Sequence, residues 1–98
     1  MRSLLNSDLL EIFCVVCEQG YLNRSAQKLG MTTSTISHAL DRLEKRVNAE
    51  LLDRNRRPVR LTEAGKTLFR ESRPLVMSLK ALQDRFGTLA YQRPALRV

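Results

Sequence analysis

The 98-residue chain has few of the features that mark membrane, disulfide-stabilised or RNA-stacking proteins. Its longest uninterrupted apolar run covers only residues 12–17, whereas a membrane helix needs about 20 apolar residues. Two cysteines, Cys14 and Cys17, are too few for a disulfide framework. Three phenylalanines and two tyrosines form no platform on which RNA bases could stack. We therefore expect one small domain in the cytoplasm, without membrane contact.

Residues that catalyse reactions or bind metals are equally sparse. The single histidine, His38, and the two cysteines are too few for a metal site, and no glycine-rich phosphate loop or nucleophile–base pair occurs. Glu44 has no acid, base or nucleophile partner at a useful spacing, so we interpret it as half of a structural ion pair. The cysteines are interpreted as packed or half-packed side chains. The sequence predicts no enzyme, no metal site and no cofactor for this chain.

Positive charge is concentrated in the second half of the chain. The net charge is +7, yet residues 1–50 carry six basic and six acidic side chains, so the excess lies in residues 51–98. Four arginines fall within seven residues there: Arg54, Arg56, Arg57 and Arg60. Arginines this close repel one another unless an anion lies between them, and polyphosphate is the commonest such anion. A solvated basic loop is the alternative.

The spacing of apolar residues predicts four helices, over 8–19, 24–29, 34–47 and 63–87. Each start has a side chain able to cap it: Ser7, Asn23, one of Thr32, Thr33 and Ser34, and finally Thr62. Each end has a glycine or asparagine suited to stopping it: Gly20, Gly30, Asn48 and Gly87. Between the third and fourth helices, residues 51–54 and 59–61 are predicted to form a short hairpin, or wing, around a turn at 55–58.

The last predicted helix carries a heptad of leucines. Leucine recurs every seven residues at positions 61, 68, 75, 82 and 89, which is typical of a helix that packs along another helix. About 25 helical residues span about 38 Å, more than the width of so small a domain. We therefore predict dimerisation through Leu68, Leu75, Leu79, Leu82 and Phe86; packing on the chain's own domain is the alternative. Pro74 is expected to kink or bend this helix.

The second and third predicted helices have the spacing of a helix-turn-helix. Ala26 supplies the small residue where the helices cross, Gly30 lies in the turn, and Ile36 is an apolar anchor in the second helix of the pair. The face opposite Ile36 is entirely polar. The sequence thus predicts a mainly α fold, a winged helix-turn-helix over 1–61 followed by a dimerisation helix over 62–90.

Several motifs carry a resemblance to a known family. Leu29, Ile36, Ser37, Leu40, Leu43 and Glu44, followed by Leu51, Arg54 and the run Leu61, Thr62, Ala64 and Gly65, resemble the amino-terminal domain of LysR-type transcriptional regulators. The resemblance covers about residues 7–90. The family usually has glutamine at Thr33, glycine at Asn48 and phenylalanine at Leu52. Thr33 is shorter than glutamine, so base preferences of relatives do not transfer directly, and the other two differences are interpreted as structural.

The resemblance implies a winged helix-turn-helix that binds promoter DNA as a homodimer through its linker helices. A carboxy-terminal domain that senses a small molecule is also implied, together with a tetramer as one possible state of the full-length protein. Residues 91–98 resemble the hinge and the start of that domain. The rival hypothesis is a winged-helix module that binds a protein through its leucine heptad.

Candidate DNA-binding residues fall into three groups. On the outer face of the third helix are Ser34, Ser37, His38 and Arg42, which can reach base edges or phosphates, with Thr32 and Thr33 acting as contacts or as caps. On the wing are Arg56 and Arg57, with Arg54 either contacting DNA or bracing the wing. Beside the second helix are Asn23, Arg24 and Lys28, expected to contact phosphates.

Overall fold

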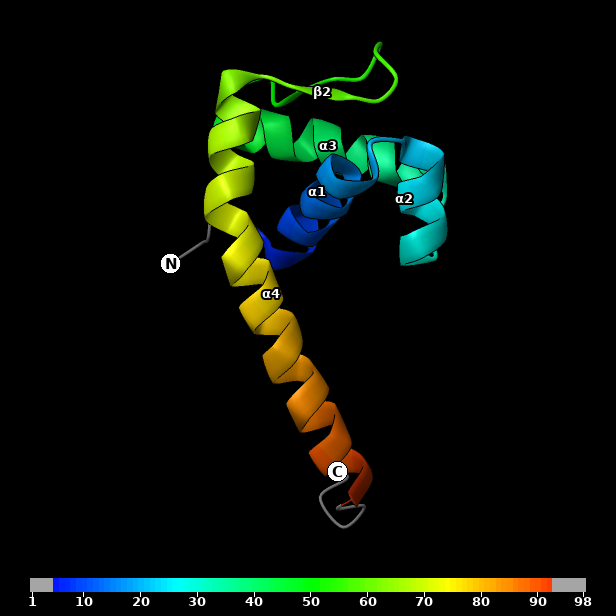
Figure 1. Cartoon of the computed structure of the whole chain (residues 1–98), viewed down its shortest axis with the longest axis vertical. Coiled ribbons are helices and arrows are strands. Elements are labelled where there is room, and N and C mark those ends of the chain that lie inside the picture. The colour runs from blue at the N-terminus through cyan, green and yellow to red at the C-terminus, as the bar shows by residue number, and fades with distance from the viewer. Residues whose placement is uncertain (1–4, 93–98) are drawn as a thin grey trace.

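The structure, a computed structural model, describes residues 5–92 of the chain, and the side chains of residues 5–87. It is mainly α-helical and contains a two-stranded wing, as predicted (Figure 1). In chain order the elements are α1 (Ser7–Gln19), α2 (Leu22–Leu29), α3 (Thr33–Val47), β1 (Leu52–Asp53), β2 (Arg60–Leu61) and α4 (Glu63–Gln92). The tail interpreted as the start of another domain, 95–98, lies outside the described residues.

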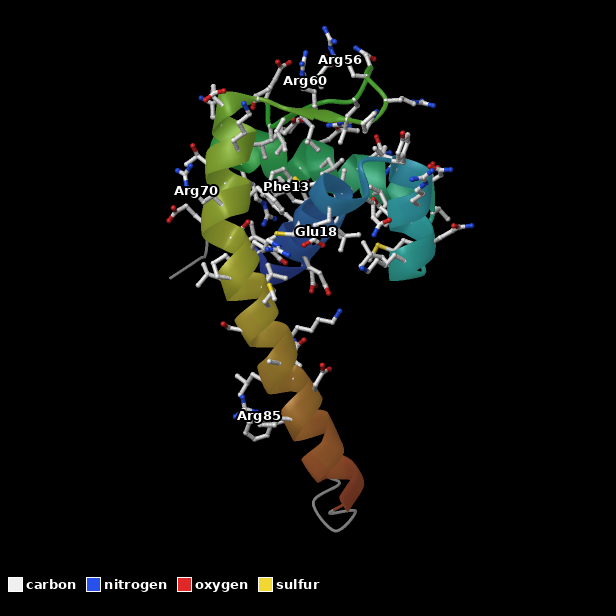
Figure 2. The ribbon with its side chains drawn as sticks, viewed as in Figure 1. Phe13, Glu18, Arg56, Arg60, Arg70 and Arg85 are labelled. Carbon is white, nitrogen blue, oxygen red and sulfur yellow. The ribbon has the colours of Figure 1, made fainter. Side chains whose placement is uncertain are left out.

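The core lies where α1 passes between α3 and α4. Phe13 and Val16 on α1 are fully buried, as are Ile36 and Leu43 on α3. Phe13 and Val16 are three positions apart, and the likewise buried Leu40 lies between Ile36 and Leu43 at spacings of four and three, so each helix presents one apolar face to the other. Figure 2 shows Phe13 in this central region. The predicted core stripe of α3 is confirmed.

The starts of the first two helices differ from the prediction. Asn6, and not Ser7, caps α1, because its Oδ1 accepts from the Asp8 N–H at 2.7 Å. The prediction that α2 begins at Arg24 with Asn23 as its cap is also wrong. The helix begins at Leu22 and has no side-chain cap. Tyr21, in extended conformation directly after left-handed Gly20 (φ 80°), precedes the helix instead.

The ends of α3 follow the sequence signals closely. Of the three hydroxyl residues before the helix, Thr32 is the cap, and its Oγ1 accepts from the Thr35 N–H at 3.1 Å. At the other end Asn48 adopts the predicted left-handed conformation, with φ of 53°. The N–H of Ala49 then donates to the Glu44 carbonyl at 3.1 Å, closing the last turn.

The wing strands are shorter than predicted. They form an antiparallel pair in which Leu52 lies opposite Leu61 and Asp53 opposite Arg60. Val59 does not belong to the strand, because its N–H donates to the Gly20 carbonyl at 2.8 Å and not to β1. The wing is thereby attached to the connection between α1 and α2.

The long helix α4 begins as predicted and ends later than predicted. Thr62 caps it, since its Oγ1 accepts from the Gly65 N–H at 3.0 Å. The expected end at Gly87 is wrong: the helix continues to Gln92, because an interior glycine weakens a helix by only about 1 kcal/mol. Pro74 lies inside the helix, and Figure 1 shows α4 changing direction in its yellow segment.

The first half of α4 belongs to the globular domain, and the second half extends away from it (Figure 1). Ser72 is buried against α1, with its Oγ 3.4 Å from Cys14 Sγ. Nearby, Arg73 Nε donates to Glu18 Oε2 at 2.9 Å. Within the described residues, α4 and the other helices lack an apolar stretch that would suffice to cross a membrane.

Candidate nucleic-acid interface

The outer face of α3 carries the predicted polar residues. Thr33, Ser34, His38 and Arg42 are exposed, and Ser37 is half-buried at the edge nearest the wing. Thr32 is exposed too, although its hydroxyl is engaged in capping. An α-helix with its side chains is about 10–12 Å wide, close to the width of the major groove of B-DNA. The helix therefore presents a polar surface of suitable size for major-groove contact.

Arg54 joins the wing to α3 through several hydrogen bonds. Its Nη2 donates to Asp41 Oδ1 at 2.7 Å and to Glu44 Oε1 at 2.8 Å, while its Nη1 donates to Ser37 Oγ at 3.1 Å. Burial acts to lower the pKa of the Arg54 guanidinium, but the hydrogen bonds to the two carboxylates outweigh it and raise the pKa above the ordinary value. The sequence allowed Arg54 either to contact DNA or to brace the wing. These contacts brace the wing against α3.

Glu44 anchors the connection between α3 and β1. Besides accepting from Arg54, it accepts from the backbone N–H of Leu51 at 2.8 Å and of Leu52 at 3.3 Å, both through Oε2. The interpretation of Glu44 as a structural ion pair is therefore confirmed. Its carboxylate fixes the backbone at the start of β1, two residues before Arg54, so the wing leaves α3 in a defined direction.

The tip of the wing presents arginines to solvent. Asp53 Oδ1 accepts from the Asn55 N–H at 3.1 Å, and its Oδ2 accepts from Arg56 Nε at 3.3 Å, which shapes the turn. Arg56 and Arg60 both point away from the body of the domain (Figure 2). Arg60 was not among the predicted site residues. Arg60 is exposed and lies opposite Asp53 in the antiparallel pair. The sequence alone did not give this register.

A cleft of about 630 Å³ separates the start of α2 from the wing. Its lining includes Asn23 and Arg24 from α2, Thr33 from α3, and Arg54 and Arg57 from the wing. Arg24 stacks on the Tyr21 ring, with its Cζ 4.3 Å from the ring centroid, so the guanidinium is held beside the helix start. Because the first N–H groups of an uncapped helix carry partial positive charge, this cleft favours an anion.

The predicted dimerisation residues form an exposed apolar stripe on the second half of α4. Leu75 is 66%, Leu82 46% and Phe86 63% exposed, and Leu79 lies on the same face. Leu68 differs, since it is half-buried and packs against the domain core. Exposed large apolar side chains at heptad spacing are typical of a surface that another helix covers.

The two cysteines pack in α1, as interpreted from the sequence. Cys14 is buried beside Ser72, and Cys17 is half-buried. Burial raises the pKa of the Cys17 thiol to about 12, with a smaller contribution from the neighbouring Cys14. A thiol with so high a pKa is a poor nucleophile. Within the described residues, no group of three or more acidic, cysteine or histidine side chains is arranged to hold a metal ion.

Comparison with known proteins agrees with this geometry. A model of the bacterial regulatory helix-turn-helix proteins of the lysR family matches residues 7–66. The HTH-type transcriptional regulator CrgA of Neisseria meningitidis is 35% identical over 78 residues, which cover 80% of this chain and 26% of CrgA. The chain thus spans about a quarter of the length of this curated relative.

Two solved structures have the same fold. The virulence activator AphB of Vibrio cholerae matches with a TM-score of 0.79 and 29% identity, over 84% of this chain and 28% of AphB. DarR of Vibrio fischeri, solved in complex with DNA, matches with a TM-score of 0.75 and 29% identity, over 94% of this chain and 31% of DarR. The chain therefore belongs to the lysR family of bacterial transcriptional regulators and contains the family's winged helix-turn-helix DNA-binding domain.

Proposed function

We propose that this chain binds operator DNA sequence-specifically as a homodimer and regulates transcription in the bacterial cytoplasm. In this proposal α3 enters the major groove, and Ser34, Ser37, His38 and Arg42 face base edges and phosphates. Arg56 and Arg57 on the wing follow the flanking minor groove or backbone, and Arg60 joins them. Asn23, Arg24 and Lys28 contact phosphates beside the cleft.

One observation carries the proposal: five of the predicted DNA-binding residues line a single cleft, namely Asn23, Arg24, Thr33, Arg54 and Arg57. The start of α2, the start of α3 and the basic wing all contribute to its lining. The exposed half of α4 extends away from this region (Figure 1), so DNA and a second chain can be bound together. DarR, whose structure this chain resembles, was solved in complex with DNA, and this likeness supports DNA binding by the chain.

The test is a fluorescence-anisotropy titration of the chain against random duplex DNA at two salt concentrations. Each phosphate contact releases counterions, so log K should fall by about 0.9 for each tenfold rise in salt per contact. Replacing Arg56 and Arg57 by glutamine should weaken binding to every sequence and reduce this slope. In the matched control, glutamine replaces Arg70 and Arg85 instead. These two exposed arginines on α4 lie away from the cleft (Figure 2), so their replacement should leave the slope unchanged.

Two results would contradict DNA binding. One is weak binding even at low salt, which the rival protein-interaction module predicts. The other is equal loss of slope in the wing and α4 variants, which would mean that net charge and not the wing governs binding.

We further propose that α4 pairs two chains through Leu75, Leu79, Leu82 and Phe86. Leu68 contributes only the part of its surface that the core leaves open. Two domains held by one helix pair would present two α3 helices to one face of the DNA, as half-site recognition by dimers requires.

Replacing Leu75 and Leu82 together by aspartate should give a monomer in sedimentation velocity and weaken DNA binding. The control is Met77→Asp, since Met77 is 57% exposed but lies on the opposite side of α4 at 100° per residue. A dimer that persists in the double variant, or dissociates equally in the control, would place the interface elsewhere.

A further inference from the structure

Two serines of the helix-turn-helix, Ser25 and Ser37, use their hydroxyls in opposite ways. Ser25 on α2 donates its O–H to the Tyr21 carbonyl four residues earlier, at 2.8 Å. Ser37 on α3 instead accepts, because Arg54 Nη1 donates to its Oγ at 3.1 Å and to its backbone carbonyl at 3.4 Å. Within the described part of the chain, the Ser37 hydroxyl hydrogen has no acceptor.

The position of Arg54 is fixed independently of Ser37. Its Nη2 bonds to both Asp41 and Glu44, and Glu44 in turn holds the backbone of Leu51. The side chain of Arg54 is only 23% exposed. The guanidinium is therefore held beside Ser37 by contacts that do not involve Ser37.

A hydroxyl that accepts from a guanidinium becomes a better donor and a poorer acceptor. The N–H of Arg54 occupies one lone pair of Ser37 Oγ, and hydrogen bonds in series polarise one another. A second N–H donor approaching the same oxygen meets the positive end of the Arg54 N–H dipole. The free O–H is then what Ser37 offers to a partner outside the domain.

We infer that Arg54 is a positioning residue that sets Ser37 as a hydrogen-bond donor, so that α3 selects a base with an acceptor at the position facing Ser37. The inference rests on the proposed function. In the major groove, guanine offers N7 and O6, adenine N7 and thymine O4, whereas cytosine offers the N4 amino group, a donor. Cytosine is therefore the disfavoured base at that position in each half-site.

The experiment measures base preference position by position. A duplex library with random half-sites is bound by the 98-residue chain, and the bound and free fractions are sequenced. One hydrogen bond of this kind corresponds to about a fivefold difference in affinity, so cytosine should be disfavoured by about fivefold at one position. Ser37→Ala should remove that difference and leave preferences at other positions in place.

Arg54→Met tests the positioning role. With the guanidinium gone, Ser37 Oγ can accept from an amino group, so the penalty against cytosine at the same position should fall to about twofold or less. Arg56→Met is the matched control: it removes one wing charge without touching Ser37, so binding should weaken for all sequences while the cytosine penalty remains. If Arg54→Met does not fold, Arg54→Met with Glu44→Gln takes its place, because glutamine keeps an acceptor for Leu51 and removes the unpaired charge.

Three results would overturn the inference. The first is an equal loss of affinity for every sequence in Ser37→Ala, which would mean a phosphate contact. The second is Ser37→Ala binding with unchanged preferences. The third is identical base preferences in Arg54→Met and Arg56→Met, which would remove the role of Arg54. Failure of the wild-type chain to bind DNA in a salt-dependent way would instead contradict the proposed function itself.

Discussion

Replacing Glu44 by alanine should lower the free energy of unfolding by about 3 kcal/mol, because three donors depend on this one carboxylate. The Leu51 N–H lies 2.8 Å from Oε2 and the Leu52 N–H 3.3 Å from it, while Arg54 Nη2 lies 2.8 Å from Oε1. The Glu44 side chain is 18% exposed, so water replaces it poorly. The variant thus leaves two backbone donors and one guanidinium partly unsatisfied.

The three bonds do not contribute equally. A short N–H bond to a charged acceptor contributes about 1.5–3 kcal/mol, which describes the bond from Leu51. The longer bond from Leu52 adds less. Because Arg54 keeps Asp41 as a partner, loss of the Arg54–Glu44 ion pair resembles loss of a surface ion pair, about 0.5 kcal/mol. Glu44→Gln keeps one acceptor oxygen and should cost only about 1 kcal/mol.

Urea unfolding followed by circular dichroism, at fixed protein concentration, measures these differences. Glu71→Ala is the control, since Glu71 is 71% exposed and pairs only with Arg70 at 3.6 Å, so its removal should change stability by about 0.5 kcal/mol at most. If the change in the free energy of unfolding caused by Glu44→Ala lies within that same range, the carboxylate does not hold the α3–β1 connection, and the reasoning is refuted.

Two other changes test the wing attachment and the packed thiol. Gly20→Ala should cost at least about 1–2 kcal/mol in thermal unfolding, because Gly20 has φ of 80° and a Cβ there would lie 2.9 Å from Pro58 Cβ; a variant as stable as wild type would contradict the close contact. Burial raises the pKa of Cys17 from 9.0 to about 12, so the protonated thiol contributes stability below pH 9 that is lost as pH rises toward 12. Stability should therefore fall less steeply over that window in Cys17→Ala, and parallel curves for the two proteins would argue against a buried thiol.

Local signals in the sequence predicted α3 almost completely. Its apolar stripe, its left-handed end at Asn48 and its cap, which the sequence narrowed to Thr32, Thr33 or Ser34, each depend on residues within one or two turns. The same is true of Thr62 at the start of α4. Local signals were not always sufficient, because the cap of α1 is Asn6 and not the neighbouring Ser7.

One error arose where a contact between distant segments decides the outcome. Val59 has the residue type of a strand, yet its N–H donates to the Gly20 carbonyl. This contact cannot be read from local spacing, because it needs the wing and the α1–α2 connection side by side. The start of α2 is different, since its cause is local: the helix follows directly on the turn at Gly20, with Arg24 stacked on Tyr21, and Asn23 was predicted as the cap by residue type alone.

The arginine cluster shows the same limit and a consequence for DNA binding. Four arginines in seven residues suggested one basic surface, but the fold divides them. Arg54 forms ion pairs with Asp41 and Glu44, and Arg56 forms an exposed ion pair with Asp53. Arg57 and Arg60 are exposed and have no ion pair within the described residues. Because only charge that is not already neutralised by a carboxylate displaces counterions fully, the wing should contribute fewer phosphate contacts than its arginine count implies, and the half-buried Arg54 acts on DNA through α3.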